Sequence, residues 1–273
     1  MKNNTTTAAK QNINSEQEHL PRTDNIIAIA SGKGGVGKTF LGISLSQAFS
    51  KLNKKTLLFD GDLGLANVDI QLGLMPERDL GSVLGGSINL EQSIIHFDLA
   101  HFDIIAGRSG VGNFATLPPL RLAQLRNELF ALGNNYDFVL VDLGAGVDRT
   151  MRLLSAYAGS YIVVTNAEPT ALTDAYAFIK ITLYEDPEAK IKIIINMADS
   201  HKEGERTFLT LSNACREFLK ISPQLAGVVR RDKKVPDSIR YQTPILTRYP
   251  SCHASNDIMD IAYRLTNRTS KRK

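Results

Sequence analysis

Short runs of β-branched and aliphatic residues recur along the chain from about residue 25 onward, and segments with a helical repeat separate them. The runs lack the polar alternation of a half-exposed strand, so each run predicts a strand that is buried on both faces. The predicted strands are Ile26 to Ala30, Thr56 to Phe59, Phe138 to Val141, Tyr161 to Val164, Ile191 to Ile195 and Leu225 to Val229. The predicted helices are Lys38 to Leu52, Arg121 to Leu132, Thr170 to Glu185, Glu203 to Leu219 and Ser255 to Asn267.

This alternation of strands and helices predicts an α/β fold with a mostly parallel, doubly wound sheet and helices on both faces. No internal repeat or Pro/Gly-rich linker divides the chain, so we expect a single domain over residues 25–268. Residues 1–24 are rich in Asn, Thr, Gln and Glu without a hydrophobic period, and they predict a disordered N-terminal extension. Residues 269–273 are expected to form a basic C-terminal tail.

The composition, with 43% hydrophobic and 22% charged residues, is typical of a globular protein and excludes a disordered or disulfide-rich chain. The longest apolar runs are far shorter than the ~20 residues of a membrane-spanning helix. The N-terminus lacks the apolar core of a secretory signal, so we expect the protein in the cytoplasm. Cys215 and Cys252 lie far apart in the sequence and predict neither a disulfide framework nor a pair of metal ligands.

The positive charge of the chain is concentrated at its C-terminal end. Residues 264–273 contain five basic residues and no acid, so the remaining residues carry a formal charge of −1, against +4 for the whole chain. A nearly neutral body argues against a DNA-binding face, which needs basic residues over a folded surface. The basic tail favours at most a weak peripheral contact with the inner face of the cell membrane.

The segment Ser31 to Thr39, SGKGGVGKT, contains the spacing G-x-x-x-x-G-K-T between a predicted strand and a predicted helix. This context is the one that a phosphate-binding loop requires, because glycines and the helix N-terminus direct backbone N–H groups at phosphates. Lys38 is expected to act on the β- and γ-phosphates of ATP, and Thr39 to place its hydroxyl on Mg²⁺. The other residues expected to bind the nucleotide are Gly32, Gly34, Gly35, Val36 and Gly37.

Polar side chains at the ends of other predicted strands add candidates. Asp60 and Asp62 lie two residues apart in an extended segment and are expected to share a face directed at the bound phosphate and metal, although a polar turn is an alternative. Asp142 ends an apolar strand, where a carboxylate is costly without a cation; it predicts a Walker B ligand of Mg²⁺, with a helix N-cap as the alternative. The amide of Asn196 can donate and accept, which suits the adenine edge, although Asn is also common in turns.

Lys33 is a second lysine within the loop, and the generic motif does not need it. The sequence K-G-G-V-G-K-T with this extra lysine resembles the deviant Walker A motif of the MinD/ParA ATPases. The resemblance implies an ATP-dependent homodimer in which Lys33 crosses the interface to contact the nucleotide of the partner. It further implies that Asp62 orients or activates the attacking water and that Asp60 supports the hydration shell of the metal. It also implies that the backbone N–H of Gly146 binds the γ-phosphate and that Asn196 contacts adenine.

Three longer stretches resemble one branch of this family, the flagellar-number regulators called FlhG or FleN. These stretches are Asp62 to Leu74 (DLGLANVDIQLGL), Glu168 to Lys180 (EPTALTDAYAFIK) and Asn196 to Phe208 (NMADSHKEGERTF). The branch resemblance implies slow, partner-stimulated ATP hydrolysis that controls flagellar number or placement. It implies partners such as a flagellar GTPase, a transcription regulator or a basal-body protein.

Two segments depart from the pattern of the family. Residues 227–232 read G-V-V-R-R-D where many relatives have G-V-I-P-x-D. Residues 16–22 match the N-terminal activating motif of the branch only in part, so activation of a partner GTPase does not follow from the sequence.

Other functions of the same fold remain open at this point. One alternative is a MinD-like or ParA-like ATPase that positions the division site, DNA or another cargo. Another is a non-hydrolysing, ATP-bound scaffold or repressor of a transcription factor. An iron–sulfur carrier would require paired cysteines at a dimer interface, which Cys215 and Cys252 do not supply.

Overall fold

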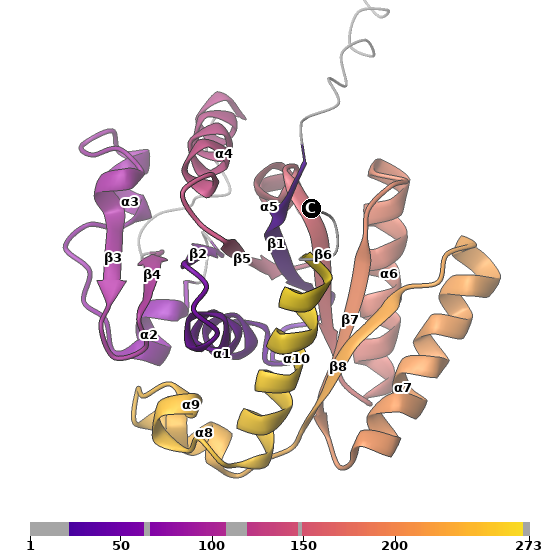
Figure 1. The fold of residues 1–273 in the computed structure, drawn as a ribbon. Coiled ribbons are helices and arrows are strands. Elements are labelled where there is room, and N and C mark those ends of the chain that lie inside the picture. Colours follow the sequence, from indigo (N-terminus) through magenta and orange to yellow (C-terminus); the bar gives the residue numbers. More distant parts are fainter. Residues whose placement is uncertain (1–21, 63–65, 108–118, 147–148, 270–273) are drawn as a thin grey trace, which may run out of the picture.

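The computed structural model describes residues 22–62, 66–107, 119–146 and 149–269 (Figure 1). The described residues contain one eight-stranded sheet with the strand order β3-β4-β2-β5-β1-β6-β7-β8. Every neighbouring pair is parallel except β3 and β4, which confirms the predicted doubly wound α/β fold. The strands are β1 (Thr23–Ser31), β2 (Thr56–Gly61), β3 (Ile94–Phe97), β4 (Phe102–Ile105), β5 (Phe138–Ala145), β6 (Ala158–Thr165), β7 (Ile191–Ala198) and β8 (Gln224–Arg230).

Helices cover both faces of the sheet, and Figure 1 shows α1 and α10 on one side with α4 to α7 on the other. Ile26 and Ala28 of β1 pack into one core, while Ile27 and Ile29 pack into the other, so the strand is apolar on both faces. The first core is covered by α3 (Leu80–Leu84), α4 (Pro119–Gly133), α5 (Arg149–Ser155), α6 (Pro169–Glu185) and α7 (His201–Ala214). The second core is covered by α1 (Lys38–Lys51), α2 (Val68–Leu72), α8 (Lys234–Arg240), α9 (Ile245–Arg248) and α10 (His253–Thr269).

Several short elements are not predicted by the sequence. The strands β3 and β4 form an antiparallel hairpin of only four residues each at the edge of the sheet. Runs this short give no clear strand period, and their pairing depends on the neighbouring β2. A 3₁₀ turn (Glu91–Ser93) precedes the hairpin. The predicted helix over Glu203 to Leu219 is present, but its last residues form a π-helical turn (Cys215–Leu219) that extends α7.

The first strand begins at Thr23, two residues before the predicted start of the domain. The backbone N–H of Thr23 donates to the carbonyl of Tyr157, and Asp24 accepts a 2.8 Å bond from Lys190, so both residues belong to the folded part. Residues 1–21 of the predicted extension and residues 270–273 of the predicted tail lie outside the described residues. Residues 63–65, within one of the stretches that resemble the flagellar branch, also lie outside them.

The structure gives a reason for Arg230 at the position where the family pattern has proline. Arg230 ends β8, and its guanidinium donates bonds of 2.9 and 2.8 Å to the two carboxylate oxygens of Asp257 in α10. The backbone N–H of Arg230 donates to the same buried carboxylate, and His201 contacts it from the start of α7. Arg230 therefore joins β8 to α10. The next residue, Arg231, has a different role because its side chain is exposed.

Candidate functional site

The segment after β1 has the shape of a phosphate-binding loop. Gly35 and Gly37 adopt φ values of 81° and 91°, in the left-handed region that favours glycine. A Cβ atom at Gly34 or Gly35 would meet no described atom within 4 Å, so this side of the loop is open. Helix α1 starts after Gly37 without a side-chain cap among the described residues. The N–H groups of its first turn therefore suit an anionic phosphate.

Gly32 serves a different purpose from the other loop glycines. A Cβ atom at this position would lie 2.1 Å from the carbonyl oxygen of Asp174 in α6, far inside van der Waals contact. Glycine is therefore required here because the loop packs directly against the backbone of α6. The predicted contact of Gly32 with the nucleotide stays a prediction.

Asn196 supports the phosphate loop from the end of β7. Its side chain is buried, and Nδ2 donates a 2.8 Å hydrogen bond to the carbonyl of Val36. A Cβ atom at Gly37 would lie 2.3 Å from this nitrogen, so the amide also packs closely on the loop. The predicted contact of Asn196 with adenine stays a prediction, and the structure gives the residue a role in holding the loop.

Lys38 and Asp142 form a buried ion pair between α1 and β5. The Lys38 ammonium lies 2.8 Å from Oδ1 of Asp142, and the two side chains are only 9% and 1% exposed. Burial raises the pKa of Asp142 above its ordinary value, and the charge of Lys38 opposes this effect. Oδ2 of Asp142 has no hydrogen-bond partner of good geometry within the described parts of the chain. A buried carboxylate oxygen without a donor is the kind of group that a metal cation satisfies.

The groups present fit a magnesium ion that is bound mainly through a nucleotide. Thr39 is buried in the first turn of α1, and its hydroxyl lies close enough to Asp142 to favour the charged carboxylate. The described residues contain no cluster of three or more His, Cys, Asp or Glu suited to a metal. Magnesium in nucleotide-binding sites commonly uses one or two protein groups together with phosphates and water. Thr39 and Asp142 are the residues that would hold it here.

Asp60 and Asp62 lie at the end of β2, next to Asp142 on the neighbouring strand, but their surroundings differ. Asp60 is completely buried, and its carboxylate accepts the N–H groups of Asp62, Asn67 and Val68 at 3.2, 3.3 and 3.2 Å. Asp62 is partly exposed, and its carboxylate lies beside Gly144 of β5. The expected common face is therefore met only in part, because Asp60 turns inward to the backbone that leads into α2. Metal support by Asp60 stays a prediction.

Asp60 should make the stability of the protein depend on pH. Burial, together with the nearby charge of Asp142, raises the pKa of Asp60 to about 7. Between its ordinary pKa of 3.8 and about 7 the folded protein keeps this proton while the unfolded chain loses it, so stability falls as pH rises through this range. Asp60→Asn cannot ionise. Its free energy of unfolding, relative to the natural protein, should rise between pH 4.5 and 8 by about 1.4 kcal/mol for each pKa unit of the shift.

Urea unfolding of both proteins, without nucleotide, measures this difference. The comparison cancels the titrating groups that do not interact with Asp60, and Asp142 is the exception because its charge acts on Asp60. Any constant cost of placing an amide beside three N–H groups appears equally at each pH. A difference that does not change with pH would show that Asp60 is ionised throughout.

Lys33 lies at the rim of the loop and is partly exposed. Its ammonium donates to Oε2 of Glu168 at 2.7 Å and to the hydroxyl of Thr170 at 2.8 Å, both on the same chain. The hydrogen bond from Lys33 holds the pKa of Glu168 below its ordinary value. The sequence patterns do not predict Glu168 and Thr170 as site residues, although Glu168 stands between a predicted strand and the proline that starts α6. Its place after a parallel strand is the signal that could have identified it.

Gly146 follows β5 with a φ of 102°, so it too uses the left-handed region. Its backbone N–H donates a 3.1 Å hydrogen bond to the carbonyl of Ser31, at the start of the phosphate loop. The segment after β5 is thus tied directly to the loop. The predicted contact of this N–H with a γ-phosphate stays a prediction, and such a contact requires the bond to Ser31 to break.

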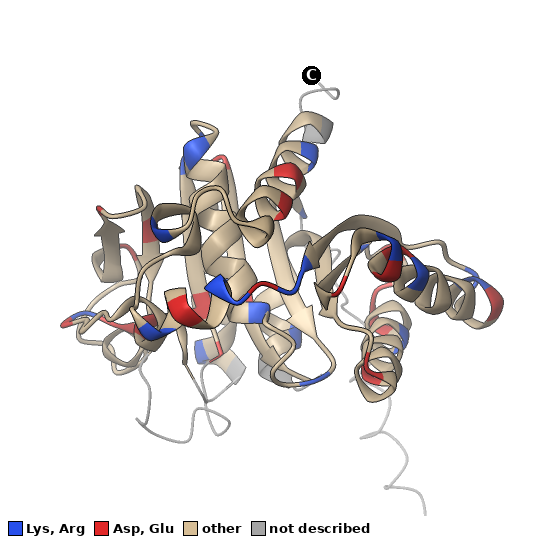
Figure 2. Cartoon of the chain, turned by 90° about the horizontal axis from the view of Figure 1, so that it is seen from below, with Lys and Arg blue, Asp and Glu red and all other residues tan. Residues whose placement is uncertain are grey.

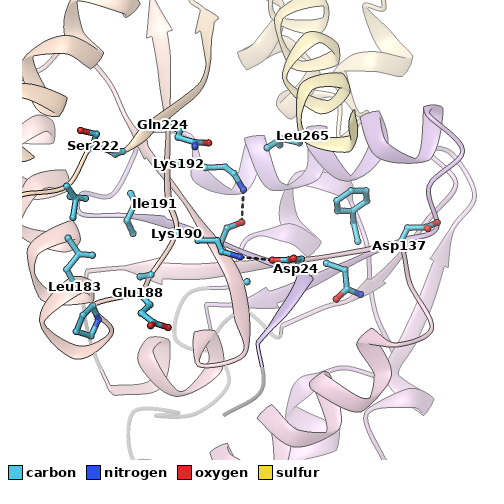
Figure 3. Close-up of a pocket in the computed structure, with 18 of the residues that line it drawn as sticks. Asp24, Asp137, Leu183, Glu188, Lys190, Ile191, Lys192, Ser222, Gln224 and Leu265 are labelled. Atoms are coloured by element: carbon cyan, nitrogen blue, oxygen red, sulfur yellow. Dashed lines mark hydrogen bonds and ion pairs between the residues drawn. The ribbon is translucent and has the colours of Figure 1, made fainter. Parts of the chain in front are cut away.

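A cavity of about 960 Å³ lies near the amino ends of the strands, at the end of the sheet opposite to the phosphate loop (Figure 3). Lys190 pairs with Asp24 there, and Lys192 donates to Ser160. No residue of the predicted nucleotide site lines this cavity. Ligands of doubly wound sheets bind beyond the carboxyl ends of the strands, so we place the functional site at the phosphate loop.

A phosphate loop at the carboxyl ends of parallel strands, with a buried lysine and a buried aspartate beside it, defines a P-loop nucleotide-binding protein. Residues 27–245 match the family of CobQ/CobB/MinD/ParA nucleotide-binding domains, which is most of the chain. The chain therefore belongs to this family.

Among curated proteins, the chain is 32% identical over 240 residues to the antiactivator FleN of Pseudomonas aeruginosa, covering 88% of this chain and 85% of FleN. It is 34% identical over 183 residues to the flagellum site-determining protein YlxH of Helicobacter pylori, covering 67% of this chain and 61% of YlxH. The septum site-determining protein MinD of Pyrococcus horikoshii, solved as a complex with Mg-ADP, has the same fold with a TM-score of 0.75. That alignment has 25% identity and covers 91% of this chain and 98% of the MinD chain.

Proposed function

We propose that this protein is an ATP-binding and ATP-hydrolysing molecular switch that dimerises with ATP and regulates flagellar number or placement. The observation that carries the proposal is Lys33, presented at the exposed rim of a complete phosphate loop. The similarity to FleN and YlxH over most of this chain supports the flagellar role.

The binding chemistry follows from the groups at the loop. Backbone N–H groups and Lys38 bind the phosphates of ATP, while Thr39 and Asp142 hold magnesium. Magnesium, when bound, supplies positive charge that offsets the charge on the phosphates. Asp62, which is partly exposed at the end of β2, orients or activates the attacking water. Hydrolysis therefore depends on a residue that the binding of ATP does not need.

Two segments connect the nucleotide to the surface of the protein. Gly146 bonds to the start of the phosphate loop, and Asp60 bonds to the backbone that begins α2. A γ-phosphate that draws these segments toward it changes the face of the protein beside the loop, and hydrolysis releases them. A partner protein that binds this face would then distinguish the ATP state from the ADP state.

The proposed partners are a second copy of the chain and a flagellar GTPase, transcription regulator or basal-body protein. None of the helices that the structure describes is both long and apolar enough to span a bilayer. We propose a cytoplasmic protein whose basic tail permits a weak peripheral contact with the membrane. In the view of Figure 2, basic and acidic residues are interspersed along the described parts of the chain.

Replacing Lys33 with alanine should prevent the dimer while leaving the binding of ATP to the monomer intact. The reason is that the phosphate loop, Lys38 and the magnesium ligands remain, whereas the side chain that contacts the second nucleotide is lost. Size-exclusion chromatography with light scattering, in ATP and in ADP, measures the oligomeric state. Lys51→Ala removes the same charge from the exposed far end of α1 and should dimerise normally. A dimeric Lys33→Ala protein would rule out the proposed switch.

The flagellar role is tested by counting flagella on cells that lack the gene and on cells that express the natural protein or Lys33→Ala. The natural protein should restore the normal number, and Lys33→Ala should not. The alternative function is a positioning ATPase of the division-site type, which the shared fold with MinD favours. Normal flagella with misplaced septa in cells that lack the gene would support that alternative.

A further inference from the structure

We propose that Glu168 is a positioning residue that retains Lys33 on its own subunit, so that Lys33 must leave Glu168 before it contacts a second subunit. This inference rests on the proposed function, because it concerns the ATP-dependent dimer. Glu168 then opposes dimerisation and sets the protein concentration at which the dimer forms.

The contact is built from several elements that fix its geometry. The Lys33 ammonium has two acceptors, Glu168 at 2.7 Å and Thr170 at 2.8 Å, and both stand at the start of α6. The loop lies directly against this helix, because Gly32 approaches the backbone of Asp174 so closely that it leaves no room for a Cβ atom. This close approach places Lys33 beside the N-terminal end of α6, where its two acceptors stand.

The carboxylate of Glu168 is oriented independently of Lys33. Asn166 is buried, and its Oδ1 accepts the backbone N–H of Glu168 at 3.0 Å. Its Nδ2 donates to Oε1 of Glu168 at 3.4 Å, which leaves Oε2 directed at Lys33. A carboxylate that its neighbour has already oriented loses less side-chain entropy when it binds a cation.

The pair is also arranged so that it can open. The side chains of Lys33 and Glu168 are 36% and 60% exposed, and ion pairs this accessible contribute little to stability. Lys33 and Glu168 can therefore separate at a small cost in stability.

Glu168→Gln keeps the shape of the side chain and removes its charge. The concentration of protein at which half is dimeric in ATP, measured by analytical ultracentrifugation, should fall about two- to thirtyfold, because each of the two subunits releases one exposed ion pair and each release contributes roughly 1.4- to 5-fold. Thr170→Val removes one acceptor only and should shift this midpoint less, in the same direction. Glu128→Gln makes the same change of charge on an exposed residue of α4 and should have no effect.

A second measurement follows Lys33 in the monomer with ADP, where no dimer is involved. Acylation of Lys33 by an N-hydroxysuccinimide ester, quantified by mass spectrometry, should be faster in Glu168→Gln, because an ion-paired amine is less available. Unchanged labelling and an unchanged midpoint would overturn the proposal, as would a higher midpoint, which would place Glu168 against the partner. If the natural protein failed to dimerise in ATP, the proposed function would fall, while the labelling would still decide whether Glu168 holds Lys33.

Discussion

Lys38→Ala is expected to lower the affinity for ATP by about 100-fold or more, because it removes the buried ammonium that we propose donates charge-assisted hydrogen bonds to the phosphates. The backbone of the loop stays in place, so the loss reports on the side chain alone. Isothermal titration with ATP and Mg²⁺ measures the affinity. Unchanged binding by a folded variant would remove the assignment of Ser31 to Thr39 as a phosphate loop.

The same substitution should also lower the stability of the protein, and this effect must be separated from the loss of ATP binding. Lys38 is paired with Asp142 inside the protein, and removal of one partner of a buried pair leaves an uncompensated charge. Such a loss commonly costs about 3–5 kcal/mol of stability. Lys38→Ala combined with Asp142→Asn removes both charges, so this double variant should recover much of the stability and still fail to bind ATP.

Asp62→Ala is expected to lower the rate of ATP hydrolysis about 10²- to 10⁴-fold, which is the usual contribution of a positioned general base. Binding of ATP should persist, because the loop, Lys38 and Asp142 are intact. The dimer should therefore accumulate in ATP, in contrast to Lys33→Ala. Release of phosphate, followed together with light scattering, measures both effects on one sample.

Asp62→Asn is the matched variant for this experiment. It keeps a hydrogen-bonding side chain of the same shape but cannot accept a proton from water. An Asn variant as slow as the Ala variant supports a base, while a nearly normal Asn variant shows that Asp62 only orients the water. An Asp62→Ala protein that stays monomeric in ATP would contradict the switch. Absence of phosphate release from the natural protein would favour the scaffold without hydrolysis.

The class of fold and the position of the phosphate loop follow from the amino-acid sequence alone. Both depend on local patterns: buried parallel strands require continuous apolar runs, and a loop that surrounds phosphates requires glycines at set spacings before a helix. The sequence did not predict the edge hairpin of β3 and β4, because strands of four residues are too short to show a hydrophobic period. Their pairing is decided by β2, which lies more than thirty residues earlier in the chain.

The pairing of the polar groups at the site follows from the folded arrangement of the chain and not from local sequence. Lys33 meets Glu168 across 135 residues of sequence, and Lys38 meets Asp142 across 104. Parallel strands bring their carboxyl ends to one edge, so an ordered list of strand ends predicts which residues gather there. It does not predict which side chains touch, because that depends on the order of strands in the sheet and on how closely the loop packs against α6. Those contacts are long-range, and no local spacing in the sequence records them.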